Sequence, residues 1–452
     1  MNRIDSMPLA LRATLLDFAA DPAQAGDAAI RHVEDGLLLV DGGRVLARGD
    51  YASLRVQHAD VLRGAQAIDL RGCLLTPGFI DTHIHLPQID VIASPARGLL
   101  EWLEQHTFVA EARFGDPAVA AEAATFFLDE LARHGTTSAA VYGSVHAVSV
   151  EALFTEAERR NVRLIAGKCL MDRNCPENLR DDAEGGVRTS ADLAARWHGR
   201  GRLSYAITPR FAATSTPRQL ELAGELARAR PELPIQSHVA ETLDEVRWIA
   251  ELFPDARSYL DVYDRAGLLR EKAIYAHCIW LDERDRARLA ESGAVAAVCP
   301  TSNLFLGSGL FDFAAARAAA MRLALGTDVG GGQSFSMLAT MRGAHDVARL
   351  KGVALSAAQL WYWATRGAAQ ALGWQDQVGA LEPGMEADFV VLDPRATPLL
   401  ARRTARAQSV EELLFALLVL GDDRAVRETY VAGLPAKAPT SARVSGGGEE
   451  RV

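Results

Sequence analysis

Two histidines separated by one residue, His83 and His85, stand in the stretch PGFIDTHIHLPQ after an apolar run. Side chains two residues apart on a β-strand point to the same side of the sheet, so both imidazoles can reach one metal ion. Taken alone, this spacing fits a partly buried histidine pair better than a metal site. Asp81 would lie on the same side, either as an acceptor that orients a metal ligand or as a turn cap.

Further metal-ligating or acidic residues follow other apolar runs. His238 in SHVAET precedes Glu241 by three residues, His277 ends YAH, and Asp328 stands in GTDVGGG. Each alone has an ordinary explanation as a core histidine, a solvated glutamate at a helix start or a turn aspartate. Together they are improbable as independent features. Three neutral imidazoles and one carboxylate suit a divalent ion, most naturally zinc, with a position left for water.

Eight strand-like runs between residues 76 and 378 must position these residues. They alternate with alanine- and leucine-rich helical stretches, which predicts an α/β fold, the (β/α)8 TIM barrel. The candidate residues, with Arg210, stand where runs end, and TIM-barrel enzymes place their catalytic residues at the C-terminal ends of the strands. The runs are CLLTPGFIDTHIH, TSAAVYG, VRLIAGKCL, LSYAITPRF, LPIQSH, KAIYAH, AVAAVCP and RLALGTD.

Short strand-like pieces separated by glycine turns lie on both sides of this zone. GLLLVDGGRVLARGD in residues 1–75 indicates hairpins, and EADFVVLDP and RETYVAGLPA in residues 379–437 return to strand-like sequence. Residues 438–452 have little to bury and are expected to be disordered. The sequence predicts a metal-dependent catalytic domain over residues 76–378 between two β-rich ends.

Composition excludes several classes of protein. Of 452 residues, 49% are hydrophobic and 23% charged, as in soluble globular proteins, and the net charge of -10 argues against nucleic-acid or membrane partners. Five scattered cysteines without a CxxC pair, no leader-like N-terminus and no membrane-length apolar run favour a cytoplasmic protein. No GxxxxGK, GxSxG or PCxxC motif occurs, so a phosphate loop, a serine hydrolase and the other zinc deaminase class are not indicated.

These motifs resemble the amidohydrolase superfamily over nearly the whole chain. The HxH pair, the histidines of the fifth and sixth runs and the aspartate of the eighth are superfamily features. LPQ, LLEWL, TPRF, MDRN and CPTSNLFLGSGLF are narrower and resemble its guanine deaminase branch. The resemblance implies a small β-sandwich built from both chain ends, a homodimer, and hydrolytic deamination of the small molecule guanine to xanthine and ammonia.

The resemblance also implies roles for individual residues. Glu241 would be the proton shuttle, His277 would lie beside the metal-bound water, and Asp328 would take the proton of that water. Since the fourth run has no lysine, one zinc ion per chain is expected. The implied zinc ligands are His83, His85, His238 and Asp328, and the implied guanine contacts are His85, Gln88, Arg210, Phe211, His238 and Asp328.

Two alternatives stay open at this point. A related deaminase acting on another purine, a triazine or a pterin-like ring would share the barrel and the metal. Only Gln88, Arg210, Phe211 and the loop after Cys299 would distinguish it. A non-catalytic binding or scaffold relative is disfavoured, because every expected ligand and Glu241 are present.

Overall fold

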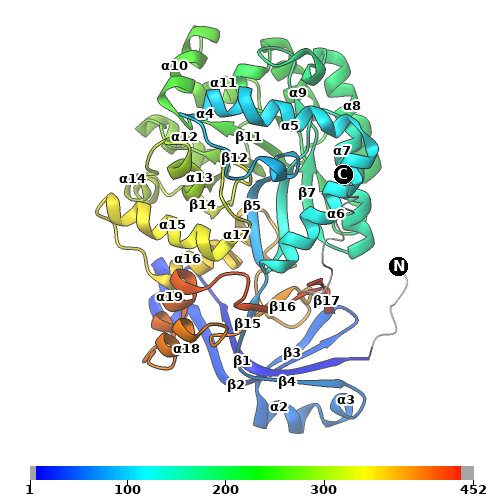
Figure 1. Cartoon of the computed structure of the whole chain (residues 1–452), viewed down its shortest axis with the longest axis vertical. Helices are drawn as coiled ribbons and strands as arrows, with labels where there is room; N and C mark the ends of the chain where they lie inside the picture. Colours follow the sequence, from blue (N-terminus) through cyan, green and yellow to red (C-terminus); the bar gives the residue numbers. More distant parts are fainter. Residues whose placement is uncertain (1–6, 439–452) are drawn as a thin grey trace, which may run out of the picture.

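The computed structural model describes residues 7–438 as an α/β zone above a sheet made from both chain ends (Figure 1). The predicted tail lies outside the described residues except for Ala438. Seven strands form the lower sheet in the order β17-β16-β15-β4-β1-β2-β3, and only β1 and β4 pair in parallel. The strands are β1 (Leu9–Phe18), β2 (Ile30–Asp41), β3 (Arg44–Asp50), β4 (Gln66–Pro77), β15 (Phe389–Leu392), β16 (Val426–Val431) and β17 (Leu434–Pro435).

The predicted hairpins are confirmed in this sheet. β2 and β3 turn through Gly42 and Gly43, whose φ angles of 54° and 77° favour glycine. Alternating side chains bury both faces: Leu11 and Leu38 pack on one face, and Leu37 and Leu39 pack with α2 (Tyr51–Gln57) on the other. Hydrogen bonding joins all seven strands into one sheet, so the two facing sheets of a β-sandwich are not confirmed.

Every predicted run of the α/β zone contains a strand. The first run spans two of them, because Cys73–Pro77 belongs to β4 and a new strand begins at Phe79 after Gly78. A side chain at Gly78 would lie 2.2 Å from Thr137 Oγ1, so the chain can pass here only without one. The strands are β5 (Phe79–His85), β6 (Thr136–Tyr142), β7 (Arg163–Gly167), β8 (Cys169–Leu170), β9 (Leu203–Tyr205), β10 (Thr208–Pro209), β11 (Ile235–Val239), β12 (Ala273–His277), β13 (Val295–Val298) and β14 (Arg322–Leu325).

Strand pairing is parallel throughout this zone, but the ladders do not run unbroken around it. They join β5-β6-β7-β9, β8-β10 and β11-β12-β13-β14. Two isolated parallel bridges, Ile207 with Ile235 and Phe211 with His238, link the chain on either side of β10 to β11. Asp328 N donates to His83 O at 2.8 Å and links the chain after β14 to β5. The predicted α/β class is confirmed, whereas a closed ladder is absent from the described residues.

Apolar side chains fill the space between these strands and helices pack outside them. Ile80, Ile165, Ile274 and Val295 form an inner layer with Trp374, just after α17. The helices are α4 (Leu99–Trp102), α5 (Phe108–Ala112), α6 (Pro117–Arg133), α7 (Ala147–Arg160), α8 (Ala183–Trp197), α9 (Pro217–Ala229), α10 (Leu243–Leu252), α11 (Tyr259–Arg265), α12 (Glu283–Ser292), α13 (Pro300–Phe305), α14 (Phe313–Ala318), α15 (Met337–Leu350), α16 (Ala357–Trp363) and α17 (Arg366–Ala371). Of two further helices, α19 (Val410–Leu420) packs against α15 and α16, and α18 (Pro398–Thr404) packs against α19 (Figure 1).

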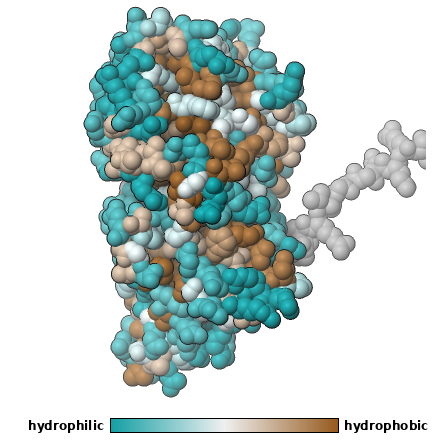
Figure 2. Space-filling view, turned by 90° about the vertical axis from the view of Figure 1, so that its left-hand side faces the viewer, coloured by the Kyte–Doolittle hydropathy of each residue, from teal (hydrophilic) through white to brown (hydrophobic). Residues whose placement is uncertain are grey.

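The face of the molecule shown in Figure 2 is largely hydrophilic, with separate hydrophobic patches. Large apolar side chains that are exposed, such as Val56, Leu350 and Leu399, stand on different helices or helix boundaries. In the described part of the chain, no helix combines the length and the apolar character needed to cross a membrane.

Candidate active site

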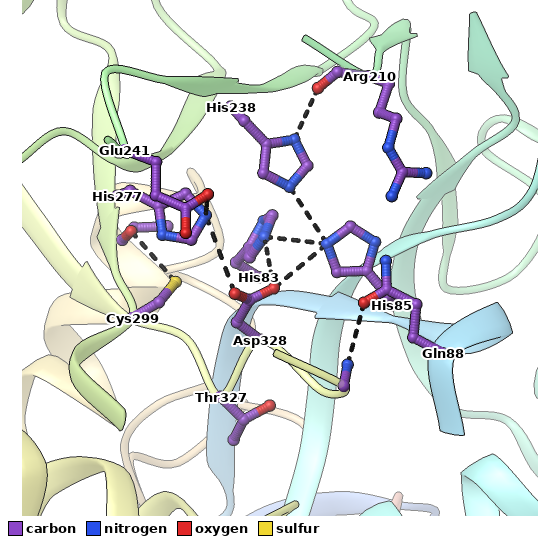
Figure 3. Close-up of polar contacts among 12 residues, drawn as sticks. His83, His85, Gln88, Arg210, His238, Glu241, His277, Cys299, Thr327 and Asp328 are labelled. Carbon is purple, nitrogen blue, oxygen red and sulfur yellow. Dashed lines mark hydrogen bonds and ion pairs between the residues drawn. The ribbon is translucent and has the colours of Figure 1, made fainter. Parts of the chain in front are cut away.

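Four predicted metal ligands meet at one end of the α/β zone. His83 and His85 end β5, His238 lies in β11 and Asp328 follows β14 (Figure 3). Their ligand atoms all lie within 4.8 Å of one another. His85 Nε2 lies 3.2 Å from Nε2 of both His83 and His238, and Asp328 Oδ1 lies 3.1 Å from His83 Nε2. The strand ends therefore bring together residues up to 245 positions apart in the sequence.

The protonation of this cluster suits a cation. Burial lowers the pKa of His83 and His238, and lowers the pKa of His85 to about 3, so the imidazoles are neutral. His238 Nδ1 lies 2.6 Å from Arg210 O, so this nitrogen carries the proton and Nε2 presents a lone pair to the cluster. Burial acts to raise the pKa of Asp328, but His83 and His85 hold it well below its usual value. Three neutral imidazoles and a carboxylate fit the ligand chemistry of zinc.

The contacts of Asp81 differ from both roles considered from the sequence, an acceptor for a ligand imidazole and a turn cap. It is fully buried, and Oδ1 accepts from His83 N at 3.2 Å and from Thr327 N at 3.0 Å. Oδ2 accepts from Thr327 Oγ1 at 2.5 Å. Burial raises the pKa of Asp81 to about 6. Asp81 therefore joins the backbones that carry His83 and Asp328, and does not accept from a ligand imidazole.

Glu241 and His277 lie next to the four-residue cluster. Glu241 Oε2 is 3.2 Å from His277 Nε2, which lies 3.9 Å from Asp328 Oδ2. Burial and the charge of Asp328 raise the pKa of Glu241 to about 8, which keeps its carboxyl protonated near neutral pH. His277 and Asp328 have φ angles of 72° and 53°, a left-handed conformation that non-glycine residues adopt mainly at functional sites.

Two residues that sequence reasoning did not single out hold this pair. Ser308 Oγ donates to Glu241 Oε1 at 2.7 Å. Asn303 Oδ1 lies 2.8 Å from His277 Nδ1, so this nitrogen is the donor and Nε2 faces Glu241. Both residues belong to the motif CPTSNLFLGSGLF. The motif indicated this region, but the sequence did not show that Asn303 contacts His277 or that Ser308 contacts Glu241.

A cavity beside the cluster contains the predicted substrate contacts. Arg210 and Gln88 line it, and both side chains also bind Glu111. Phe211 lies next to Arg210 and bridges to the strand of His238. The other lining residues include Leu99, Trp102, Leu103, Leu306 and Gly331. The structure thus places polar groups, an aromatic ring and the Glu241 carboxyl around one space.

Lys168 does not join the metal cluster. Its Nζ lies 2.6 Å from Asp181 Oδ2 and donates to Cys169 O at 3.1 Å. The lysine at the end of the third predicted run is thus engaged in a buried ion pair. Among the His, Cys, Asp and Glu residues within residues 7–438, two groups could hold a metal ion: His83, His85, His238 and Asp328, and His277, Cys299 and Asp328.

The chain is similar to known proteins over most of its length. Residues 74–435 match the amidohydrolase family. A guanine deaminase of Escherichia coli K12 is 46% identical over 405 residues, which are 90% of this chain and 92% of that protein. The crystal structure of guanine deaminase from Bradyrhizobium japonicum superimposes with a TM-score of 0.91 at 35% identity, covering 95% of this chain and 99% of the other.

A more distant structure shares the fold alone. An atrazine chlorohydrolase from Arthrobacter aurescens, complexed with zinc, superimposes with a TM-score of 0.81 at 21% identity. This similarity covers 96% of this chain and 97% of the other. The fold therefore accommodates more than one hydrolytic chemistry, and the residues around the cavity must distinguish them.

Proposed function

Because the chain belongs to the amidohydrolase family, we propose that it catalyses hydrolytic deamination of guanine to xanthine and ammonia with one zinc ion per chain. The identity to the E. coli guanine deaminase over most of both chains supports this activity. One observation carries the proposal: the same cavity is lined by His85, His238 and Asp328, which are candidate metal ligands, and by Arg210 and Gln88. The candidate metal ligands and the groups that would bind the purine therefore face the same cavity.

Zinc would be held by His83, His85, His238 and Asp328, whose ligand atoms already converge. When bound, the ion would lower the pKa of a water molecule and supply hydroxide near neutral pH. The neutral imidazoles and the ionised carboxylate need no proton change to act as ligands. Zinc content is therefore a direct test of these four residues.

The remaining chemistry is proton transfer and positioning by side chains. Hydrolysis joins the oxygen of water to C2 of guanine and releases the C2 amino group as ammonia. Asp328 can accept the proton of the attacking water, because the neighbouring imidazoles keep its carboxylate ionised and free of a proton. Glu241, protonated near neutral pH, can donate its proton to N3 of the ring. Of the two protons of the attacking water, one can then pass through Glu241 to the leaving amine, and the other restores the protonated carboxyl of Glu241. His277, oriented by Asn303, lies where it can hold the attacking oxygen.

Recognition follows from the donors and acceptors of the purine edge. Arg210 offers rigid N–H donors to the carbonyl oxygen at C6. Gln88 offers an N–H and an acceptor to the ring nitrogens, and Phe211 offers an apolar face. Adenine would place an amino group against Arg210 and leave a buried donor unpaired, at a cost of a few kcal/mol, about 1 to 3.

The finer architecture is inferred in the same way. Residues 76–378 would form a closed (β/α)8 barrel, because the parallel ladders already run in barrel order and isolated backbone contacts cross the gaps between them. Residues 1–75 and 379–437 would form the accessory β-domain as a sandwich. Family resemblance supports a homodimer. All five cysteines are free thiols, which supports a reducing, cytoplasmic location.

Ammonia release from guanine tests the proposal, with adenine, cytosine and a triazine run in parallel. Wild-type protein should release ammonia from guanine, and Glu241→Gln should release almost none. Arg210→Ala should lose much of the preference for guanine over adenine. Zinc-loaded wild type that turns over a triazine or a pterin but not guanine would favour the related deaminase.

Metal content separates an enzyme from a binding or scaffold protein. Purified protein should contain close to one zinc per chain, and less than about half would favour a non-catalytic relative. His238→Ala removes one imidazole from the converging set and should lower the zinc content. Retention of full zinc in this variant would refute the proposed ligand set.

A further inference from the structure

The helical segment Leu99–Ala112 forms one wall of the cavity and has no part in the chemistry above. It consists of α4, the π-helical turn η3 (Leu103–Thr107) and α5. Leu99, Trp102 and Leu103 line the cavity. Beyond them, α5 carries Phe108 and Glu111, which are three residues apart and therefore lie on one side of the helix. The motif LLEWL begins this segment, so the contacts of α5 bear on its function.

Glu111 binds both polar residues that face the purine position. Its Oε2 accepts from Arg210 Nη1 at 2.5 Å, and its Oε1 accepts from Gln88 Nε2 at 3.1 Å. The Phe108 ring centre lies 5.5 Å from Arg210 Cζ. Glu111 is 0% exposed, and Arg210 and Gln88 are each 2% exposed. One helical turn thus holds the guanidinium by charge and by an aromatic ring.

These contacts determine how both side chains face the cavity. A carboxylate can only accept, so its partner on Gln88 must be the amide nitrogen. Gly330 N can only donate, and it donates to Gln88 Oε1 at 3.1 Å. The two partners exclude the flipped amide. Each of Gln88 and Arg210 keeps further N–H groups beyond those that bind Glu111, and both residues line the cavity.

The charge of the substrate explains why a carboxylate is needed here. A buried guanidinium requires a counter-charge, because desolvation of an unpaired cation is costly. Guanine is neutral, so its carbonyl oxygen accepts a hydrogen bond without supplying that charge. Glu111 supplies it, as the coulombic attraction that raises the pKa of Arg210 against the effect of burial indicates.

We propose that Glu111 is a positioning residue that makes the site selective for purines with a carbonyl at C6, by holding Arg210 and Gln88 in their donor orientations. This inference rests on the proposed function. Glu111→Gln keeps the shape of the side chain but offers only one accepting oxygen to two donors. One donor would then face an amide N–H, and Arg210 would lose its counter-charge.

The test compares guanine with 2-aminopurine, which keeps the C2 amine and lacks the C6 carbonyl. Glu111→Gln should lower kcat/KM for guanine by about 10- to 100-fold, and should lower it much less for 2-aminopurine. In an Arg210→Ala background, adding Glu111→Gln should change the ratio of the two kcat/KM values by less than about twofold, since the residue acts largely through Arg210. Zinc per chain and the thermal midpoint are measured for each variant.

Glu104→Gln is the matched control, because Glu104 lies in η3 of the same segment and is exposed. Glu104→Gln should leave kcat/KM unchanged for both guanine and 2-aminopurine. If Glu111→Gln does not fold, Glu111→Asp is used instead. It keeps the negative charge but shortens the side chain by one methylene, and it should also lower the ratio of kcat/KM for guanine to kcat/KM for 2-aminopurine. Equal losses for both substrates, or unchanged guanine kinetics, would overturn the inference. Wild type inactive on guanine would overturn the proposed function, and this inference with it.

Discussion

At the scale of single residues, the surroundings move the pKa values of two carboxyl groups in one cavity in opposite directions. Glu241 is buried beside the charge of Asp328, and its pKa is raised to about 8. Asp328 is held ionised by the neighbouring imidazoles of His83 and His85. One carboxyl is therefore protonated and the other ionised at the same pH, and in the proposed hydrolytic deamination the first would donate a proton and the second would accept one.

The pH dependence of turnover should report Glu241. The protonated form is the donor and predominates below its pKa, so activity should fall as pH rises through about 8. A cation held by His238 and the other ligands would favour the carboxylate, so this limb should lie at that pH or below. The measurement is kcat for guanine across mildly acidic to alkaline buffers. Activity that keeps rising well above this range would contradict the assignment.

Ser308→Ala should shift the alkaline limb of this pH profile in a defined direction. The hydrogen bond from Ser308 Oγ stabilises the charged form of Glu241 and acts to lower its pKa. Without the hydroxyl, the protonated form should persist to higher pH, so the alkaline limb should move upward while zinc content stays the same. A limb that moves downward, or does not move, would show that another group controls it.

At the scale of elements, the loop after β14 is packed so tightly at Gly332 that it has no space for a side chain. Gly332 N donates to Asp328 O at 2.5 Å and folds the loop back on itself. A Cβ at Gly332 would lie 1.8 Å from Thr327 O, which is backbone and cannot turn away. Thr327 also binds Asp81, so the position of Asp328 depends on this turn.

Gly332→Ala should therefore displace Asp328 and lower kcat for guanine by about 100-fold, because small displacements of catalytic groups have large effects. Zinc content and the thermal midpoint should fall as well. Gly64→Ala is the control, since Gly64 is exposed, has φ of -106° and meets its nearest atom at 3.9 Å. A Gly332→Ala enzyme with normal kcat and zinc would show that the loop relaxes without moving Asp328.

At the scale of the whole molecule, a network of charges joins the α/β zone to the sheet of the chain ends. Glu386, just before β15, pairs with Arg163 of β7 at 2.6 Å and with Arg202, just before β9, at 2.7 Å. Asp388 also binds Arg202 and accepts from Ala432 N at 2.7 Å. The arginines are 9% and 8% exposed, so these charges are largely removed from water.

Glu386→Ala should leave two nearly buried arginines with one fewer counter-charge and lower the free energy of unfolding by about 3 kcal/mol. Urea denaturation followed by tryptophan fluorescence measures this change, and kcat of the folded enzyme should be unaffected. Asp60→Ala removes the exposed pair with Arg63 and should change stability by less than about 1 kcal/mol. Equal effects of the two variants would show that the network does not hold the two parts together.

Much of the fold and of the site followed from local sequence alone. The period of two along a strand placed His83 and His85 on one side, and the positions of Arg210, His238, His277 and Asp328 at run ends predicted one shared edge. Parallel strands require their C-terminal ends to meet, so spacing along the chain was sufficient. The glycine turn inside GLLLVDGGRVLARGD identified the hairpin of β2 with β3.

Other features depended on contacts that no local pattern encodes. In the sequence, Glu111 is one charged residue among many on a helix, and only folding brings it to Arg210, 99 residues away. Ser308 likewise contacts Glu241 over a separation of 67 residues. Whether a buried carboxyl is ionised depends on every neighbour within a few ångströms, and those neighbours come from many elements. The sequence by itself therefore determined which chemical groups gather at the strand ends, because strand geometry is local. Only the tertiary structure decided how those groups are charged and oriented, because burial and long-range pairing exist only in the folded chain.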